Sequence, residues 1–177
     1  DIRFNSLHSN EINKLMLFEK YKIPTLETAL EKFPETFFQI DVKTDEVTKP
    51  AMKIIKETNS LDRVCIASFS SERLKLVSSL YPQVCMSMGP KEIIKLFFAS
   101  FGLYKKKIPG DCLQIPIYQY GIKLATKRFV KYVQGIGLKI HVWTINDEDT
   151  MQRLIDIGVD GIITDRPKAL KDLLSNR

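Results

Sequence analysis

HVWTIND, from His141 to Asp147, and GVDGIITDRP, from Gly158 to Pro167, decide the fold of this chain. The first stretch is predicted to be a strand with His141 and Trp143 on one face, because side chains two residues apart share a face. A short capped helix follows, and the second stretch is predicted to be another strand that ends in a charged turn. We therefore expect a closing βαβ unit of a barrel whose chemistry lies at the strand ends.

Strands and helices alternate along the chain from Ile23 onward. The six predicted strands are Phe37–Lys43, Val64–Phe69, Val84–Met88, Cys112–Ile117, Lys139–Ile145 and Gly161–Thr164. Because parallel strands need helical crossovers, this alternation predicts an α/β fold with a parallel sheet. Both an open six-stranded sheet and a TIM-type (β/α)8 barrel lacking its first two strands fit, since a whole barrel takes about 250 residues. No G-x-G-x-x-G motif follows a strand, which removes the usual dinucleotide argument for the open sheet.

The chain is predicted to have two parts. Residues 1–22 form a polar, irregular lead-in with a short helix at Ile12–Phe18, and residues 23–177 form an incomplete barrel domain. Thr25 is predicted to cap the first helix of that domain, with Thr28 at its third position. The next helix is predicted at Pro50–Thr58. A barrel without two adjacent strands has two unpaired edges. We therefore expect these residues alone to aggregate, to swap, or to depend on a separately supplied N-terminal piece.

The amino-acid composition limits the classes of protein to which this chain can belong. The 177 residues are 44% hydrophobic, enough for one core, and no run of about eighteen apolar residues predicts a transmembrane helix.

Cys65, Cys85 and Cys112 are predicted to be buried free thiols, which favours a reducing compartment. The net charge of +6 indicates an anionic partner, such as phosphate or a lipid surface, or a missing acidic N-terminal segment. No basic stripe with stacking aromatic residues occurs, so we expect no nucleic-acid partner.

The strand Phe37–Lys43 carries the main candidates for chemistry. Its alternation puts Gln39, Asp41 and Lys43 on one face, which climbs toward the carboxyl end of the strand, where such barrels work. Asp41 is predicted to bind a divalent cation, and Lys43 to neutralise an anion bound to that cation. The alternative is a mutual ion pair that only satisfies the polarity of the two side chains.

Three other side chains are candidates with an open alternative. Trp143 is predicted to form an apolar wall of a substrate pocket near the mouth of the barrel, and the alternative is a core filler. His141, on the same face, is predicted to be a core filler with a hydrogen-bonded imidazole. Gln114 lies in the middle of a strand, and its amide needs partners, either from a substrate or from the protein itself.

The segment Ile93–Phe101, with Leu103 and Lys105–Lys107 behind it, is apolar beyond one helix face and ends in basic residues. Apolar bulk beside basic residues suits an anionic membrane surface or a lipid tail. The other interpretation is an outer barrel helix followed by a loop.

From about Ile23 to Leu174 the chain resembles the glycerophosphodiester phosphodiesterase family. In the order of the family's own sequence, Ile23–Glu27 resembles I-P-T-L-E, Gln39–Lys43 resembles N-I-E-I-K, Ala67–Phe69 its S-F strand end, Leu113–Pro116 resembles L-Q-V-P, and the closing stretches resemble V-W-T-x-N and G-V-D-G-I-I-T-D-x-P. Each single match is a weak signal, whereas the whole series of matches in the correct order is specific for the family.

The resemblance implies a TIM-type barrel that hydrolyses glycerophosphodiesters, or lysophospholipids, to an alcohol and glycerol phosphate with Mg²⁺ or Ca²⁺ and two histidines. It places Asp41 where the family has a metal-ligand glutamate, Lys43 at a phosphate contact and Trp143 at a pocket aromatic. The family's H-R-G…P-E-N-T opening, its E-x-D pair and its second histidine do not occur in this chain. No catalytic residue is therefore assigned, and the chain by itself is expected to be inactive.

Two other functions stay open. A non-catalytic barrel remnant would bind phosphorylated ligands or a lipid surface through Lys43 and the segment Phe97–Lys107. A barrel of this kind could also cleave a lipid phosphodiester by intramolecular cyclisation, as related phospholipase-D-like toxins do. The expected location is cytoplasmic or membrane-associated.

Overall fold

The computed structural model describes residues 6–104 and 108–175. Its helices are α1 (Ser9–Ile12), α2 (Leu26–Lys32), α3 (Asp45–Glu57), α4 (Ser71–Leu80), α5 (Pro90–Ala99), α6 (Lys127–Gly135), α7 (Glu148–Ile157) and α8 (Pro167–Ser175). Its strands are β1 (Met16–Leu17), β2 (Tyr21–Lys22), β3 (Phe38–Asp41), β4 (Val64–Ala67), β5 (Cys85–Met86), β6 (Cys112–Ile115), β7 (Tyr118–Gln119), β8 (Ile122–Lys123), β9 (Lys139–Val142) and β10 (Gly161–Ile162). None of the described helices has the length and apolar character needed to cross a lipid bilayer.

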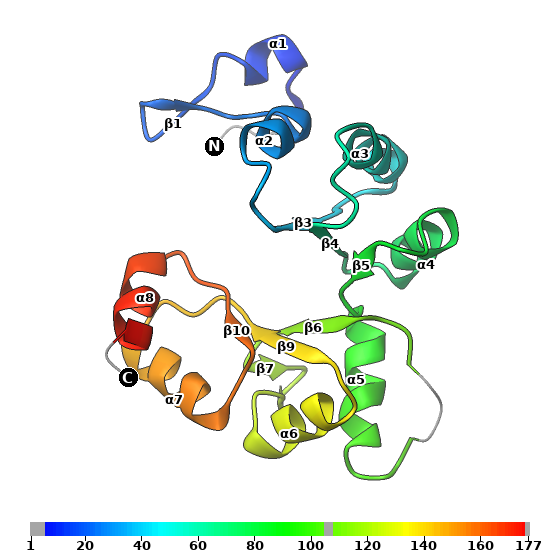
Figure 1. Ribbon diagram of the computed structural model, residues 1–177, viewed down its shortest axis with the longest axis vertical. Coiled ribbons are helices and arrows are strands. Elements are labelled where there is room, and N and C mark those ends of the chain that lie inside the picture. The colour runs from blue at the N-terminus through cyan, green and yellow to red at the C-terminus, as the bar shows by residue number, and fades with distance from the viewer. Residues whose placement is uncertain (1–5, 105–107, 176–177) are drawn as a thin grey trace.

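Six parallel strands follow one another around a curved sheet. One half has the order β3-β4-β5 and the other β6-β9-β10, and a single parallel bridge between Ser87 and Cys112 joins them. Each strand is followed by a helix, and the helices lie outside the curve (Figure 1). These are six consecutive βα units of a TIM-type barrel, which confirms the predicted fold class. Among the described residues, β3 and β10 each have a strand partner on one side only.

The sequence alternation of the strands separates an apolar outer face from a polar inner face. Ile66, Leu113, Ile140 and Val142 are fully buried between the sheet and its helices. Burying a side chain of this size contributes roughly 1.5–3 kcal/mol. The apolar residues form two clusters, one under α2 to α4 and one under α5 to α8. The inner-face residues are thereby directed into the lumen.

Short polar caps set where the helices begin. The Thr25 hydroxyl accepts a hydrogen bond from the Thr28 amide at 3.1 Å, which confirms the predicted cap of α2. Asp147 caps α7 in the same way through the Thr150 amide at 2.8 Å. Gly158 ends α7 with a φ of 86°, a left-handed conformation that glycine adopts without strain.

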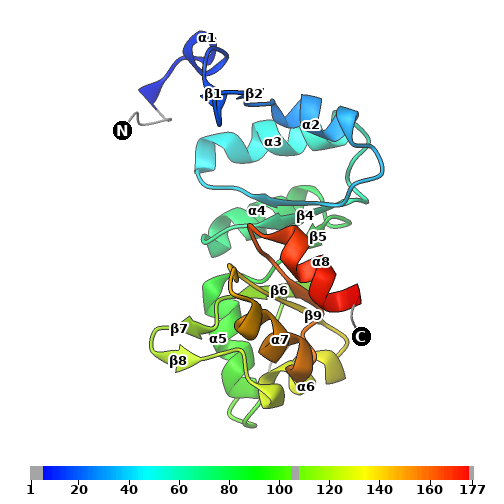
Figure 2. The ribbon, with the colours of Figure 1, turned by 90° about the vertical axis from the view of Figure 1, so that its left-hand side faces the viewer.

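Two sequence predictions of helix position were wrong. The helix predicted at Ile12–Phe18 does not form: α1 ends at Ile12, and Met16–Leu17 is the first strand of a β-hairpin of β1 and β2, which lies beside α2 (Figure 2). Phe18 and Glu19 have φ values of 52° and 57°, so the chain reverses there and cannot continue as a right-handed helix.

Helix α3 begins at Asp45, five residues before the predicted start at Pro50. The acidic residues Asp45 and Glu46 favour the first turn of a helix because they complement its dipole. Proline is common at the first position of a helix, which is why the sequence predicts a start at Pro50, but Pro50 lies inside α3.

Candidate active site

The side chain of Asn146 holds the closing βαβ unit together at the carboxyl ends of its two strands. Its Nδ2 donates to Asp165 Oδ2 at 2.9 Å, and its Oδ1 accepts from the Thr164 hydroxyl at 3.0 Å and the Asp165 amide at 2.9 Å. The Arg166 guanidinium donates to the Asn146 carbonyl at 3.0 Å. These bonds join the chain segments that follow β9 and β10. They fix the strand end from which Trp143 enters the lumen.

A cavity of 680 Å³ lies at the carboxyl ends of the strands. All four side chains proposed from the sequence line it: Asp41, Lys43, Gln114 and Trp143. This is the end of a TIM-type barrel where active sites lie. The cavity, called the mouth cavity below, is the candidate site.

Asp41 and Lys43 form an ion pair with each other. Their side chains are 33% and 69% exposed, so solvent screens the pair and it contributes little to stability. The Lys43 ammonium also lies 5.4 Å from the centre of the Phe69 ring. The pair predicted as the structural alternative is thus present, and both charges remain accessible from the cavity.

Aromatic side chains form the apolar side of the mouth cavity. Trp143 packs edge-on against Phe69, with ring centres 6.2 Å apart. Gln114 lies deeper, with its Nε2 3.8 Å from the Cys65 thiol. Its amide therefore has a weak partner inside the protein and still borders the cavity.

The hairpin of β7 and β8 adds three residues that the sequence analysis did not assign to the site, namely Tyr118, Gln119 and Tyr120. Tyr120 and Gly121 have φ values of 51° and 77°, the positive values that a tight two-residue hairpin turn requires. In the sequence, the only indication of this hairpin turn was the Tyr-Gly pair between two short apolar stretches. The Gln119 Oε1 atom is buried and has no hydrogen-bond partner among the described residues.

His141 lies below the mouth cavity rather than in its wall. Its Nδ1 is 3.0 Å from Gln39 Nε2, across the lumen from β9 to β3. Burial lowers the pKa of the imidazole below its ordinary value. A half-buried, hydrogen-bonded imidazole matches the predicted core filler.

The three cysteines are free, as predicted, but their burial differs. Cys112 is buried and Cys65 half-buried, whereas Cys85 is exposed, so the prediction of burial was wrong for Cys85. Hydrogen bonds from Cys112 and then Cys65, helped by the charge of His141, hold the pKa of the Cys85 thiol well below its ordinary value. A second cavity, of 560 Å³, opens at the amino ends of the strands and is lined by Cys65, Cys85 and His141. We call it the floor cavity.

The segment predicted to contact lipid corresponds to α5 and the turn after it. Phe98, Phe101 and Leu103 are exposed, whereas Phe97 packs against Phe129 with ring centres 5.3 Å apart. Phe97 therefore belongs to the core and not to the predicted contact surface. Lys105–Lys107 lie outside the described residues, and membrane contact stays a prediction.

Fold and site together define an α/β-barrel protein with a charged and aromatic cavity at the carboxyl ends of its strands. The model of the glycerophosphoryl diester phosphodiesterase family matches residues 3–169, and the chain belongs to that family.

Individual relatives agree with this assignment. The chain is 32% identical over 173 residues to a Mycobacterium tuberculosis protein named "Probable glycerophosphodiester phosphodiesterase 2", an alignment that covers 94% of this chain. It is 22% identical over 183 residues to a human lysophospholipase D, covering 88% of this chain and 57% of that protein. Its fold matches a glycerophosphodiester phosphodiesterase structure from Parabacteroides distasonis with a TM-score of 0.74, at 24% identity, covering 97% of this chain and 72% of that one.

The chain spans 66% of the length of the Mycobacterium tuberculosis relative and 65% of an uncharacterised Bacillus subtilis one.

Proposed function

We propose that the full-length protein hydrolyses glycerophosphodiesters in the mouth cavity, releasing an alcohol and glycerol phosphate with the help of a divalent cation. The observation that carries this proposal is the convergence of Asp41, Lys43, Gln114 and Trp143 on one cavity, in a chain of this family. The cavity also lies at the end of the strands where TIM-type barrels do their chemistry.

Asp41 and Lys43 would supply the charges for a phosphodiester. Asp41 is the only carboxylate among the described residues that line the mouth cavity. Its oxygens suit Mg²⁺ or Ca²⁺, but such ions take about six to eight oxygen ligands, so Asp41 would be one ligand of several. When bound, the cation would polarise the phosphoryl oxygens. Lys43 would exchange its contact with Asp41 for a charge-assisted hydrogen bond to the phosphate.

The aromatic side of the cavity would receive the organic part of the substrate. Trp143 and Phe69 form an apolar wall, and the centre of the Phe69 ring lies 5.4 Å from the Lys43 ammonium. Gln119 Oε1 is buried without a partner among the described residues. A buried acceptor of this kind costs free energy unless a donor reaches it. A hydroxyl group of the glycerol moiety would satisfy it.

The test is hydrolysis of glycerophosphocholine by the full-length protein with Mg²⁺ or Ca²⁺, compared with the Asp41→Asn variant. Asparagine keeps the shape of the side chain and removes its charge, so we expect a loss of about 100-fold or more, because several kcal/mol of charge stabilisation disappears. Asp62→Asn is the matched control, since Asp62 is an exposed carboxylate at the floor cavity. Equal activity of Asp41→Asn and the native protein would remove Asp41 from the site.

The same assay separates the proposal from its two rivals. A full-length protein that binds glycerol phosphate and hydrolyses nothing would be the non-catalytic barrel remnant. A cyclic phosphate product, identified by ³¹P NMR, would indicate cleavage by intramolecular cyclisation.

A second candidate substrate class is lysophospholipids. The observation that favours it is the exposed aromatic surface at the rim, where Phe69, Tyr118 and Tyr120 are 62%, 60% and 80% exposed. Such a surface fits an acyl chain better than it fits a small polar alcohol. Tyr120→Ala should then lower the hydrolysis of lysophosphatidylcholine more than that of glycerophosphocholine. An equal effect on both substrates would argue for the small substrate.

A further inference from the structure

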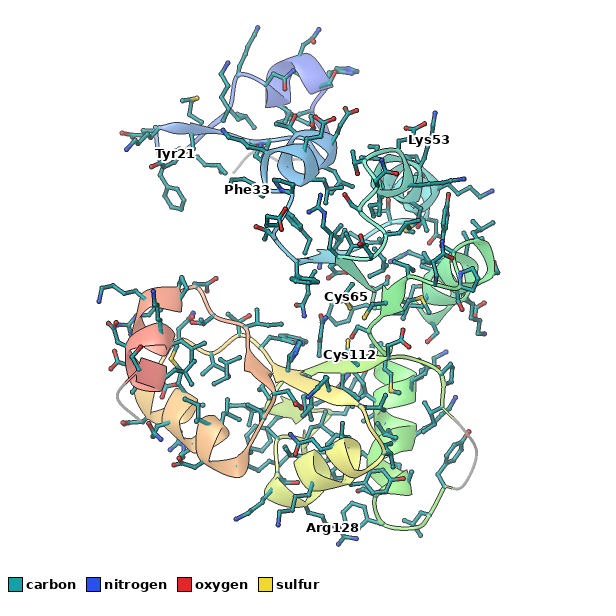
Figure 3. The ribbon with its side chains drawn as sticks, in the orientation of Figure 1. Tyr21, Phe33, Lys53, Cys65, Cys112 and Arg128 are labelled. Carbon is teal, nitrogen blue, oxygen red and sulfur yellow. The ribbon has the colours of Figure 1, made fainter. Side chains whose placement is uncertain are left out.

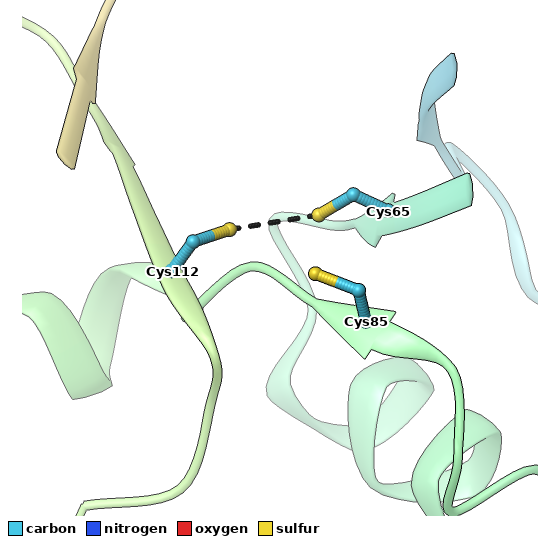
Figure 4. Close-up of side chains that lie close together, drawn as sticks. All are labelled: Cys65, Cys85 and Cys112. Carbon is cyan, nitrogen blue, oxygen red and sulfur yellow. Dashed lines mark hydrogen bonds between the residues drawn. The ribbon is translucent and has the colours of Figure 1, made fainter. Parts of the chain in front are cut away.

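Three cysteine side chains meet inside the sheet, away from the mouth cavity. Cys65, Cys85 and Cys112 come from β4, β5 and β6, and their sulfur atoms all lie within 4.8 Å of one another (Figure 4). The Cys65 and Cys112 sulfurs are 3.5 Å apart. Figure 3 places Cys65 and Cys112 where the two halves of the curved sheet meet.

Strand register explains why residues so far apart in the sequence converge. Cys65 is directly opposite Cys85 in the parallel pair β4–β5. The next strand, β6, joins through the pairing of Ser87 with Cys112. Ile66 and Leu113, the sequence neighbours of Cys65 and Cys112, are fully buried toward the helices, so alternation directs the thiols into the lumen.

We propose that Cys65, Cys85 and Cys112 bind one thiophilic metal ion, of the Zn²⁺ type, in a site separate from the catalytic cation. Thiolate ligands select soft or borderline ions such as Zn²⁺, whereas Mg²⁺ and Ca²⁺ prefer oxygen. Each thiol gives its proton to the solvent as its metal–sulfur bond forms. No oxidant or reductant is needed.

For Cys65 and Cys112 the distances favour a shared metal ion over a disulfide. Zinc–sulfur bonds of about 2.3 Å in tetrahedral geometry place sulfurs about 3.8 Å apart, inside the observed range. A disulfide needs sulfurs about 2.05 Å apart and Cα atoms within about 6.8 Å. Cys65 and Cys112 are separated by a whole strand, so their backbones are about 9.6 Å apart at the usual spacing of about 4.8 Å per strand.

The surroundings offer access and a fourth ligand. Cys65, Cys85 and His141 all line the floor cavity, through which an ion can reach the thiols. A tetrahedral ion bound by three cysteines has one more position, which water or the imidazole of His141 would fill. Gln114 adds an amide donor 3.8 Å from the Cys65 sulfur, and such hydrogen bonds from outside the ligand set orient metal-bound thiolates.

The metal site would strengthen the connection between the two halves of the curved sheet. Strands β3, β4 and β5 form one ladder and β6, β9 and β10 another, and one isolated bridge connects them in the described residues. A metal ion held by β4, β5 and β6 would tie the two ladders together. The role inferred for it is therefore structural, because no substrate-lining residue of the mouth cavity is among the ligands.

The test is titration of the reduced, chelator-treated full-length protein with Cd²⁺, whose bonds to thiolates absorb in the ultraviolet. We expect one equivalent to produce the thiolate absorption, and a large excess of Zn²⁺ to lower it by competing for the same thiolates. Cys65→Ser, Cys85→Ser and Cys112→Ser should each weaken binding by more than the roughly 10- to 100-fold that loss of an outer partner costs. Asp41→Asn is the matched control: it should lose hydrolysis and keep the cadmium–thiolate absorption.

Two results would overturn the site. One is the absence of thiolate absorption in the native protein, and the other is an affinity in all three serine variants that equals the affinity of the native protein. If a serine variant does not fold, alkylation of the native protein decides the question, with modified residues identified by mass spectrometry. Cd²⁺ should slow alkylation of all three cysteines together, and protection of one or none, or loss of two thiols to a disulfide, contradicts the proposal.

Discussion

Replacing Asp160 by alanine should destabilise the closing βαβ unit, because this carboxylate joins the starts of β9 and β10. It accepts hydrogen bonds from the Ile140 amide at 3.0 Å, from Gln134 Nε2 at 3.1 Å and from the Lys139 ammonium at 2.9 Å. Ile140 is fully buried, so its amide has little alternative access to water. Asp160 also lies in the GVDGIITDRP stretch from which the fold was predicted.

The three contacts differ in what their loss should cost. An amide left without its charged partner costs about 1.5–3 kcal/mol, and the bond from the exposed Gln134 side chain about 1 kcal/mol. The Lys139 side chain is 70% exposed, so its ion pair contributes only about 0–1 kcal/mol. Because these terms share one carboxylate and are not additive, we expect Asp160→Ala to lower the free energy of unfolding by about 2–4 kcal/mol.

Urea denaturation of the full-length protein at neutral pH measures this difference, with Lys139→Ala as the control that removes only the ion pair. Burial opposes the charge of Asp160, but hydrogen bonds from Lys139, Ile140 and Gln134 outweigh it and hold the carboxyl pKa below its ordinary value of 3.8. The contribution is therefore complete above pH 3.8 and disappears as the pH falls through the lower, folded-state pKa. The reasoning fails if Asp160→Ala stays within about 0.5 kcal/mol of the native protein, the range of ordinary surface substitutions, or if Lys139→Ala costs as much.

Three further predictions concern other parts of the molecule. Arg63→Ala should lower the free energy of unfolding by about 2–4 kcal/mol, since its guanidinium donates to the carbonyls of Leu30, Phe33 and Thr36; Arg63→Lys, measured in the same urea series, should recover only part of this. Burial lowers the pKa of His141 below 6.5, so the unfolded chain binds the proton first and stability should fall as the pH drops below 6.5; an NMR titration that gives an ordinary pKa contradicts this. Lys43→Ala should raise the KM for glycerophosphocholine about 10- to 100-fold, since a hydrogen bond to a charged group contributes about 1.5–3 kcal/mol, with the exposed Lys53→Ala as control.

The fold could be predicted from the sequence because its strands follow a simple rule. Alternation in Phe37–Lys43 and Lys139–Ile145 correctly separated the lumen face from the helix face, and so placed Asp41 and Trp143 at one cavity. The predictions failed where backbone conformation, not hydrophobic pattern, decided the structure. The positive φ values at Phe18–Glu19 and Tyr120–Gly121 create two hairpins that period counting does not detect.

Convergence between distant strands was the other property that the sequence could not supply. The three cysteines fall on separate predicted strands with no CxxC spacing, and nothing in their order indicates that they share one point in space. Only the register of β4, β5 and β6 brings them together.

Four residues of the closing family motif hold the barrel structure rather than the chemistry of the site. Asn146 hydrogen-bonds to both Thr164 and Asp165, and Asp160 connects the strands at the other end of the same unit. These positions of the closing motif therefore hold β9 and β10 in place. None of the four lines the mouth cavity. Substitutions at these residues should therefore lower the stability of the protein. They should change its activity only indirectly, by moving Trp143. This separates them from Asp41, whose replacement by asparagine should lower hydrolysis about 100-fold or more without a comparable loss of stability, because its ion pair is exposed.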